Sequence, residues 1–178
     1  MTRLACAGLV AMLLLPGCRD RAGGGHLELR WKGSARGTLA APATADWCAL
    51  LRLLEIRSVK GDTGVAIALY PTEALVSGTY PVKPPAKTGP PPPAARLAVR
   101  WPGQTAIRGF QGDSGTVIVE RSAKGVVSGR VTAFAHSATD TGALEINGRF
   151  RDLVVQMPKE GCVAADTLNA PPIDTLVH

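Results

Sequence analysis

The sequence predicts an all-β fold, an antiparallel β-sandwich or barrel of about seven to nine strands. Three observations support this prediction. Short segments of the chain alternate apolar and polar residues, and turn sequences rich in Gly, Asp and Ser separate these segments. With only three Trp, two Tyr and three Phe among 178 residues, the core of a single domain must consist mainly of Val, Leu and Ile.

Six segments show the alternation expected of half-buried strands. They lie at residues 27–31, 65–69, 96–101, 117–119, 126–135 and 144–150. The sequence Ser122-Ala123-Lys124-Gly125 joins two of them, and its glycine suits the left-handed position of a short hairpin loop. Strands at this spacing, joined by turns, are typical of sandwiches and barrels.

The stretch before residue 60 fits two structures. Four apolar residues between positions 47 and 54 recur at helical spacing. Residues 53–60, however, lead directly into Lys60-Gly61-Asp62-Thr63-Gly64, which has the composition of a hairpin turn. We therefore expect a strand at 53–60, preceded by a short helical turn between Asp46 and Arg52.

Two segments of the body lack strand periodicity. Residues 81–93 include Pro84-Pro85 and four consecutive prolines at 90–93, which have no amide to donate to a sheet. This Pro-rich loop is expected to be a stiff surface excursion, as a tolerated insertion rather than a ligand for a proline-recognising groove. The β domain is expected to span residues 26–157, followed by an irregular C-terminal tail at 158–178.

The N-terminus has the pattern of an export signal. Arg3 supplies a positive charge, and residues 4–15 form an almost unbroken apolar run. A membrane-spanning helix needs about 20 apolar residues, so this run is too short to span a bilayer. Its length fits the apolar region of a secretory signal peptide covering residues 1–17.

The run ends in Leu15-Pro16-Gly17-Cys18, which resembles the lipobox of bacterial lipoproteins, although Pro16 departs from the usual Ala or Ser. The resemblance implies cleavage before Cys18, a diacylglyceryl group on its sulfur, and acylation of the new amine. The membrane would then be held through the lipid on Cys18, with residues 18–25 as a flexible, glycine-rich tether. Arg19 stands where an Asp would imply retention in the inner membrane, so the resemblance points to the outer membrane.

The four cysteines divide cleanly if the chain is such a lipoprotein. Cys6 leaves with the signal peptide and Cys18 is alkylated, which leaves Cys48 and Cys162 in an oxidising compartment. A disulfide between Cys48 and Cys162 is therefore expected. The alternative is a pair of buried free thiols.

Gly112-Asp113-Ser114-Gly115 resembles the nucleophile motif of chymotrypsin-like proteases. In that family a glycine and a proline follow, whereas Thr116 and Val117 follow here. The mechanism also needs a histidine base, and the one upstream histidine, His26, lies beside the tether. We therefore interpret residues 112–115 as a turn.

Asp62-Thr63-Gly64 and Asp140-Thr141-Gly142 resemble the active-site triplet of aspartic proteases, whose chemistry needs two carboxylates sharing one proton. That family places each triplet after a buried apolar strand. Lys60-Gly61 and Ala138-Thr139 precede the triplets here, so both are expected to be exposed turns.

No other pattern predicts catalysis, a cofactor or a metal site. His26, His136 and His178 have no Cys or His neighbour at ligand spacing, and the net charge of +6 is scattered, which disfavours nucleic-acid binding. The sequence thus predicts an outer-membrane lipoprotein that is not an enzyme, with a β domain that binds or supports an envelope protein partner. The alternatives are a β-barrel for a small apolar ligand and an aspartic-protease-like hydrolase.

Overall fold

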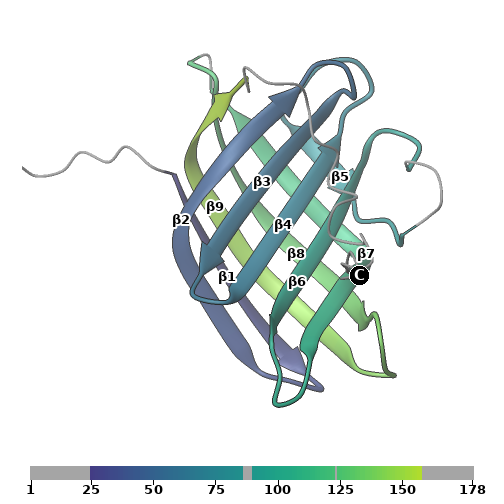
Figure 1. Cartoon of the computed structure of the whole chain (residues 1–178). Helices are drawn as coiled ribbons and strands as arrows, with labels where there is room; N and C mark the ends of the chain where they lie inside the picture. The colour runs from purple at the N-terminus through teal and green to yellow at the C-terminus, as the bar shows by residue number, and fades with distance from the viewer. Residues whose placement is uncertain (1–24, 86–89, 123, 158–178) are drawn as a thin grey trace, which may run out of the picture.

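The computed structural model describes residues 25–85, 90–122 and 124–157. Every regular element in this part of the chain is a β-strand, and the strands wrap into a barrel (Figure 1). The strands are β1 (His26–Gly33), β2 (Gly37–Cys48), β3 (Leu53–Lys60), β4 (Thr63–Tyr70), β5 (Gly78–Pro81), β6 (Ala94–Pro102), β7 (Ile107–Arg121), β8 (Val126–Ser137) and β9 (Ala143–Gln156).

The sheet closes on itself, which makes the fold a barrel and not a sandwich. The strand order is β5-β7-β6-β4-β3-β2-β1-β9-β8, and an additional pairing between β7 and β8 completes the ring. Neighbours in the ring are antiparallel, and β5 is the extra strand, paired with the second half of β7. The predicted all-β fold of seven to nine strands is confirmed.

Strand alternation puts the apolar side chains inside the ring. Leu27, Leu29 and Trp31 of β1 are buried, whereas Glu28 between them is half-buried and Arg30 is exposed. The inward side chains of the other strands pack with these three into one continuous cluster. An eight-stranded ring is narrow enough for side chains to fill its interior, and this core is built in that way.

The barrel has two distinct mouths, which we name by their turns. The lower mouth is formed by the β1–β2, β3–β4, β6–β7 and β8–β9 turns; the upper mouth is formed by the β2–β3 and β7–β8 turns and the β4–β5 connection. Near the lower mouth, Trp31 stacks on Trp101 with ring centroids 5.3 Å apart, and Trp101 stacks on Phe110 at 5.0 Å. This aromatic stack fills the interior close to the lower mouth.

The structure of residues 46–60 confirms one prediction made from the sequence and contradicts another. The predicted strand at 53–60 is present as β3. The predicted helical turn between Asp46 and Arg52 is wrong, because β2 continues to Cys48 and residues 49–52 form a tight turn with Arg52 N donating to Ala49 O at 3.4 Å. Asp46 pairs with both β3 and β9, and these ladder hydrogen bonds outweigh the local helical spacing.

Residues 112–115 are also not the turn that their composition suggested. They lie within β7, where the register with β8 shifts between Gly112 and Ser114, a β-bulge. Gly115 has a φ of 122°, a conformation that side chains disfavour. The bulge lets β7 change partners, from β6 along its first half to β5 along its second.

The Pro-rich loop joins the sheet at its first two residues. Pro81 ends β5 opposite Thr116, and Val82 forms an isolated bridge with Ala95. Val82 N donates to Gly115 O at 2.9 Å. A proline can occupy this place because β5 is short and its free edge needs no donor there.

Candidate functional site

The β4–β5 connection folds over the upper mouth. Its residue Leu75 is 5% exposed and packs against the core cluster, as does Tyr80 in β5. Two arginines fasten the backbone of the connection. Arg52 Nη1 donates to Thr72 O at 3.3 Å, and Arg121 Nη1 donates to Leu75 O at 3.0 Å. The connection is therefore a fixed cover on the barrel, held from two sides.

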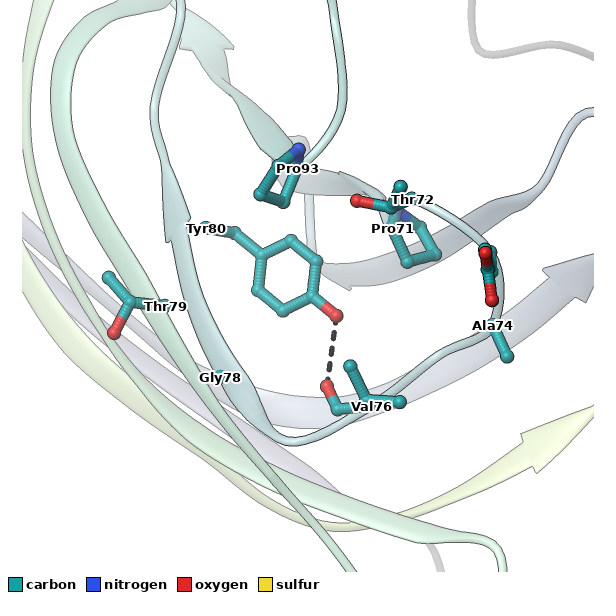
Figure 2. A pocket seen from close by; sticks show the side chains of 9 residues that line it. Pro71, Thr72, Ala74, Val76, Gly78, Thr79, Tyr80 and Pro93 are labelled. Atoms are coloured by element: carbon teal, nitrogen blue, oxygen red, sulfur yellow. Dashed lines mark hydrogen bonds between the residues drawn. The ribbon is translucent and has the colours of Figure 1, made fainter.

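A pocket of about 360 Å³ opens between this connection, β5 and the end of the Pro-rich loop. We call it the mouth pocket. Figure 2 shows the ring of Tyr80 between Pro93 and Val76, with its hydroxyl group donating to Val76 O at 2.9 Å. The residues that line the pocket are Pro71, Thr72, Glu73, Ala74, Val76, Gly78, Thr79, Tyr80 and Pro93.

The mouth pocket is lined mainly by apolar groups, and the exposed Glu73 adds a carboxylate to the lining. Burial raises the pKa of Tyr80 above its usual value, so the phenol stays protonated at neutral pH. Two prolines, an alanine and a valine supply apolar wall, and Thr72 and Thr79 offer hydroxyl groups at the edge. Such a site can hold a small apolar group, but it places no nucleophile beside a base.

Three cysteines were predicted to be modified, and one of them, Cys48, lies in the described part of the chain. It ends β2, is 6% exposed, and its sulfur accepts a hydrogen bond from Leu51 N at 3.4 Å. Cys48 packs with Leu53 and Ala68 in a small apolar cluster separate from the core inside the barrel. Cys18 and Cys162 lie outside the described residues, so the predicted lipidation and disulfide stay predictions.

The two aspartate triplets lie in different turns of the lower mouth. Asp62 is in the β3–β4 turn and Asp140 is in the β8–β9 turn, and β1 and β2 stand between these hairpins in the ring. Both aspartates are exposed, as predicted for turn residues. This separation does not fit two carboxylates that share one proton.

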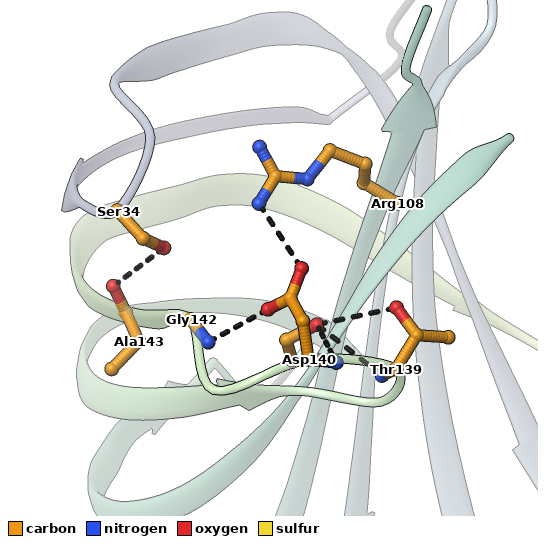
Figure 3. A network of polar contacts seen from close by, with 7 residues as sticks. Ser34, Arg108, Thr139, Asp140, Gly142 and Ala143 are labelled. Carbon is orange, nitrogen blue, oxygen red and sulfur yellow. Dashed lines mark hydrogen bonds and ion pairs between the residues drawn. The ribbon is translucent and has the colours of Figure 1, made fainter. Parts of the chain in front are cut away.

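The carboxylate of Asp140 stabilises its own turn (Figure 3). Its Oδ1 accepts a hydrogen bond from Gly142 N at 2.7 Å, and its Oδ2 lies 3.5 Å from Arg108 Nη2. The hydrogen bond from Gly142, with a smaller contribution from Arg108, holds the pKa of this carboxyl below its usual range. The carboxylate thus acts as a local cap on the turn.

In the structure, Asp113 of the Gly-Asp-Ser-Gly sequence lies close to a histidine that the sequence did not identify as its neighbour. His136 of β8 places Nδ1 3.6 Å from Asp113 Oδ2 on the outside of the barrel. Among the described residues, however, no hydrogen bond joins Ser114 to His136, and the ion pair is about half exposed. The register of β7 and β8, which no spacing rule reveals, brings the pair together.

Within residues 25–85, 90–122 and 124–157, no group of His, Cys, Asp and Glu could hold a metal ion. That same part of the chain contains no helix long and apolar enough to cross a membrane. Comparison with protein-family models, curated proteins and solved structures found no match for this chain.

Proposed function

We propose that this protein is a bacterial envelope lipoprotein, anchored through lipid on Cys18, whose β-barrel is a non-catalytic binding module. We further propose that the mouth pocket binds a small apolar ligand. The anchor rests on the apolar run and on Leu15-Pro16-Gly17-Cys18. The binding role rests on the mouth pocket.

The proposed binding role is supported mainly by the position of the mouth pocket, which lies outside the packed interior of the barrel. Inward side chains from around the ring already form one buried cluster, which favours binding at the mouth over binding within the barrel. A volume of about 360 Å³ lies near the lower end of the range for ligand pockets. It suits a compact apolar molecule of a few rings.

The proposed anchor is tested by mass spectrometry of protein extracted from the membrane fraction of the native host. The N-terminal peptide should begin at Cys18 and carry the mass of a diacylglyceryl group with an amide-linked acyl chain. Cys18→Ser should abolish this modification. An unmodified Cys18 in the mature chain would contradict the anchor.

The proposed pocket is tested with the neutral apolar dye N-phenylnaphthylamine. Val76 is 57% exposed and lines the pocket, so Val76→Asp should place a charge in the pocket without disturbing the core. The matched control is Val59→Asp, because Val59 is 62% exposed and lies near the lower mouth. Dye fluorescence should rise saturably with wild-type protein and with Val59→Asp.

The Val76→Asp variant should bind the dye about tenfold more weakly, which corresponds to about 1.4 kcal/mol of binding free energy. Equal melting temperatures for the two variants would show that the fold is intact. Equal dye affinity in Val76→Asp and wild type would show that the dye does not use the mouth pocket. The pocket would then have no support as the ligand site.

A further inference from the structure

Exposed apolar side chains gather at the upper mouth. Leu50 and Leu51 form the tip of the β2–β3 turn, with 87% and 44% of their surfaces exposed. Val76 in the β4–β5 connection is 57% exposed, and Met157 directly after β9 is 77% exposed. Four large apolar residues from three separate segments therefore project at one end of the barrel.

Turn formation does not require these residues. Tight turns favour Gly, Asn, Asp and Ser for backbone reasons, whereas the two leucines at this tip keep 87% and 44% of their surfaces in contact with water after folding. The lower mouth also exposes Val59 and Ile107, but its turn tips are polar, for example Gly61-Asp62 in the β3–β4 turn and Asp140 in the β8–β9 turn. The contrast indicates that the upper mouth presents its apolar side chains to something other than water.

Cationic side chains surround this apolar group. Arg52 follows the two leucines in the same turn, and Lys124 lies in the β7–β8 turn, with both residues exposed. Lys83 and Arg121 are exposed at the same mouth, together with the acidic Glu73 and Glu120. Four cationic and two acidic side chains thus border the apolar group, and this excess of positive charge suits the interface of an anionic bilayer, where phosphate groups border the acyl chains.

The entry point of the chain also favours this end. Gly25 precedes β1 and its carbonyl oxygen accepts a hydrogen bond from Ala43 N at 2.8 Å, part-way up the barrel wall. The seven residues at 18–24 can extend over at most about 25 Å. From Pro42, which pairs with His26, β2 rises for about 20 Å to the upper mouth, within reach of this tether. The lower mouth lies about 23 Å away along β1 in the opposite direction, so the tether reaches the upper mouth with slightly more length to spare.

We infer that the upper mouth docks on the anionic phospholipid surface that holds the lipid of Cys18. In this arrangement Leu50, Leu51 and Met157 enter the bilayer interface, and Arg52 and Lys124 contact lipid phosphates. The inference rests on the proposed anchor and extends it, because it fixes which end of the barrel faces the membrane. Val76 belongs both to this apolar group and to the mouth pocket, so the pocket would open beside the lipid.

The test uses the mature, lipidated chain reconstituted in vesicles of brominated phosphatidylcholine and phosphatidylglycerol, since bromine quenches nearby tryptophan. Leu50→Trp reports on the upper mouth. Ile107→Trp is the matched control, because Ile107 is 66% exposed at the lower mouth. Quenching is measured relative to the wild-type chain, which carries three tryptophans of its own.

The inference predicts several-fold stronger added quenching for Leu50→Trp than for Ile107→Trp, and weaker quenching of Leu50→Trp when phosphatidylglycerol is omitted. Mass spectrometry of the same sample shows whether the chain is lipidated. It therefore separates a failure of the proposed anchor from a failure of the docking surface. A lipidated chain with equal quenching at both positions, or stronger quenching at Ile107→Trp, would overturn the docking surface alone. A mature chain without lipid would overturn the anchor and the docking surface together.

Discussion

The indole ring of Trp31 lies against the Cα of Gly37, its register partner across the β1–β2 pair. A Cβ atom at residue 37 would sit 2.5 Å from Cε2 and Cζ2 of that ring. The same indole stacks on Trp101, so it cannot yield without disturbing the aromatic stack near the lower mouth. The missing side chain of Gly37 is thus what allows the stack to form beside β2.

Gly37→Ala should lower the free energy of unfolding by about 1–3 kcal/mol, the usual range for overpacking a core contact. Urea denaturation followed by tryptophan fluorescence measures the change. Gly109→Ala is the matched control, since a Cβ atom there would meet nothing within 4 Å. A Gly37→Ala variant as stable as Gly109→Ala would contradict the importance of the close approach.

The predicted disulfide gains a structural context from the surroundings of Cys48. Outward positions on barrel strands usually face water, yet Cys48, Leu53 and Ala68 are only 4–6% exposed and Tyr70 packs against them. Leu54, Ile56, Ile67 and Leu69 alternate with these residues and point into the core. The predicted disulfide would join Cys162 to this outer cluster.

Reduction of the disulfide, or Cys162→Ser, should lower the stability by about 2–4 kcal/mol, because the bond would close a loop of about 114 residues. Thermal melting with and without reductant checks the change. The double variant Cys48→Ser, Cys162→Ser is the control, and reductant should leave its melting temperature unaltered. Two free thiols per mature wild-type chain, counted under denaturing and non-reducing conditions, would refute the pairing.

An ion pair across β1 and β9 predicts a loss of stability in acid. Arg149 Nη2 lies 2.9 Å from Glu28 Oε2, and Arg30 approaches the other oxygen at 3.4 Å. The hydrogen bond from Arg149 and its charge hold the pKa of Glu28 below the usual 4.5. The unfolded chain therefore binds this proton more readily than the folded barrel does.

The contribution of Glu28 to the free energy of unfolding should be complete above pH 4.5. It should disappear as the pH falls through the lowered pKa of the folded state. Denaturation of wild type and Glu28→Gln at a series of acidic pH values measures it, and the variant should show a shallower acid decline. Arg149→Met should flatten the curve in the same way. Additive effects in the double variant would show that the two side chains do not act as a pair.

Asp62→Asn and Asp140→Asn should behave as turn substitutions. Each should change the stability by about 1 kcal/mol or less, with the larger effect at Asp140, whose carboxylate accepts a hydrogen bond from Gly142. Cleavage of a denatured protein substrate at acid pH should be undetectable with the wild-type chain. Cleavage that pepstatin inhibits and that Asp62→Asn abolishes would reverse the non-catalytic assignment.

Local alternation predicted the fold class, and the turn sequence at residues 60–64 predicted the strand that became β3. Alternation works because one side of each strand contacts the core and the other meets solvent, as Leu27 and Arg30 show in β1. It failed for β2, in which Ala and Thr residues leave little hydrophobic contrast, and for β5, which spans only Gly78–Pro81. Ring closure could not be predicted from the sequence, because it depends on the long-range pairing of β7 with β8 and of β1 with β9.

The mouth pocket could not be predicted for a related reason. Pro71, Tyr80 and Pro93 belong to three different segments, and no periodicity marks them as neighbours. The bulge at Gly112–Ser114 redirects β7 toward β5, and this places Tyr80 at the upper mouth. The adjacent leucines at 50 and 51 were visible in the sequence, but their exposure became evident only when β2 was found to reach Cys48.

The seam between β1 and β9 has a consequence for how the chain acquires its structure. His26 pairs with Arg151, so the first described strand finds its last partner near the end of the β domain. Contacts between such distant residues are slow to form, since a long loop must be ordered before any of them is gained. A nascent chain that ends before β9 would leave β1 and β8 as open edges, exposed to pairing with other chains. Productive folding must therefore wait until residues 143–156 are available, so the barrel closes late relative to the synthesis of its first strand.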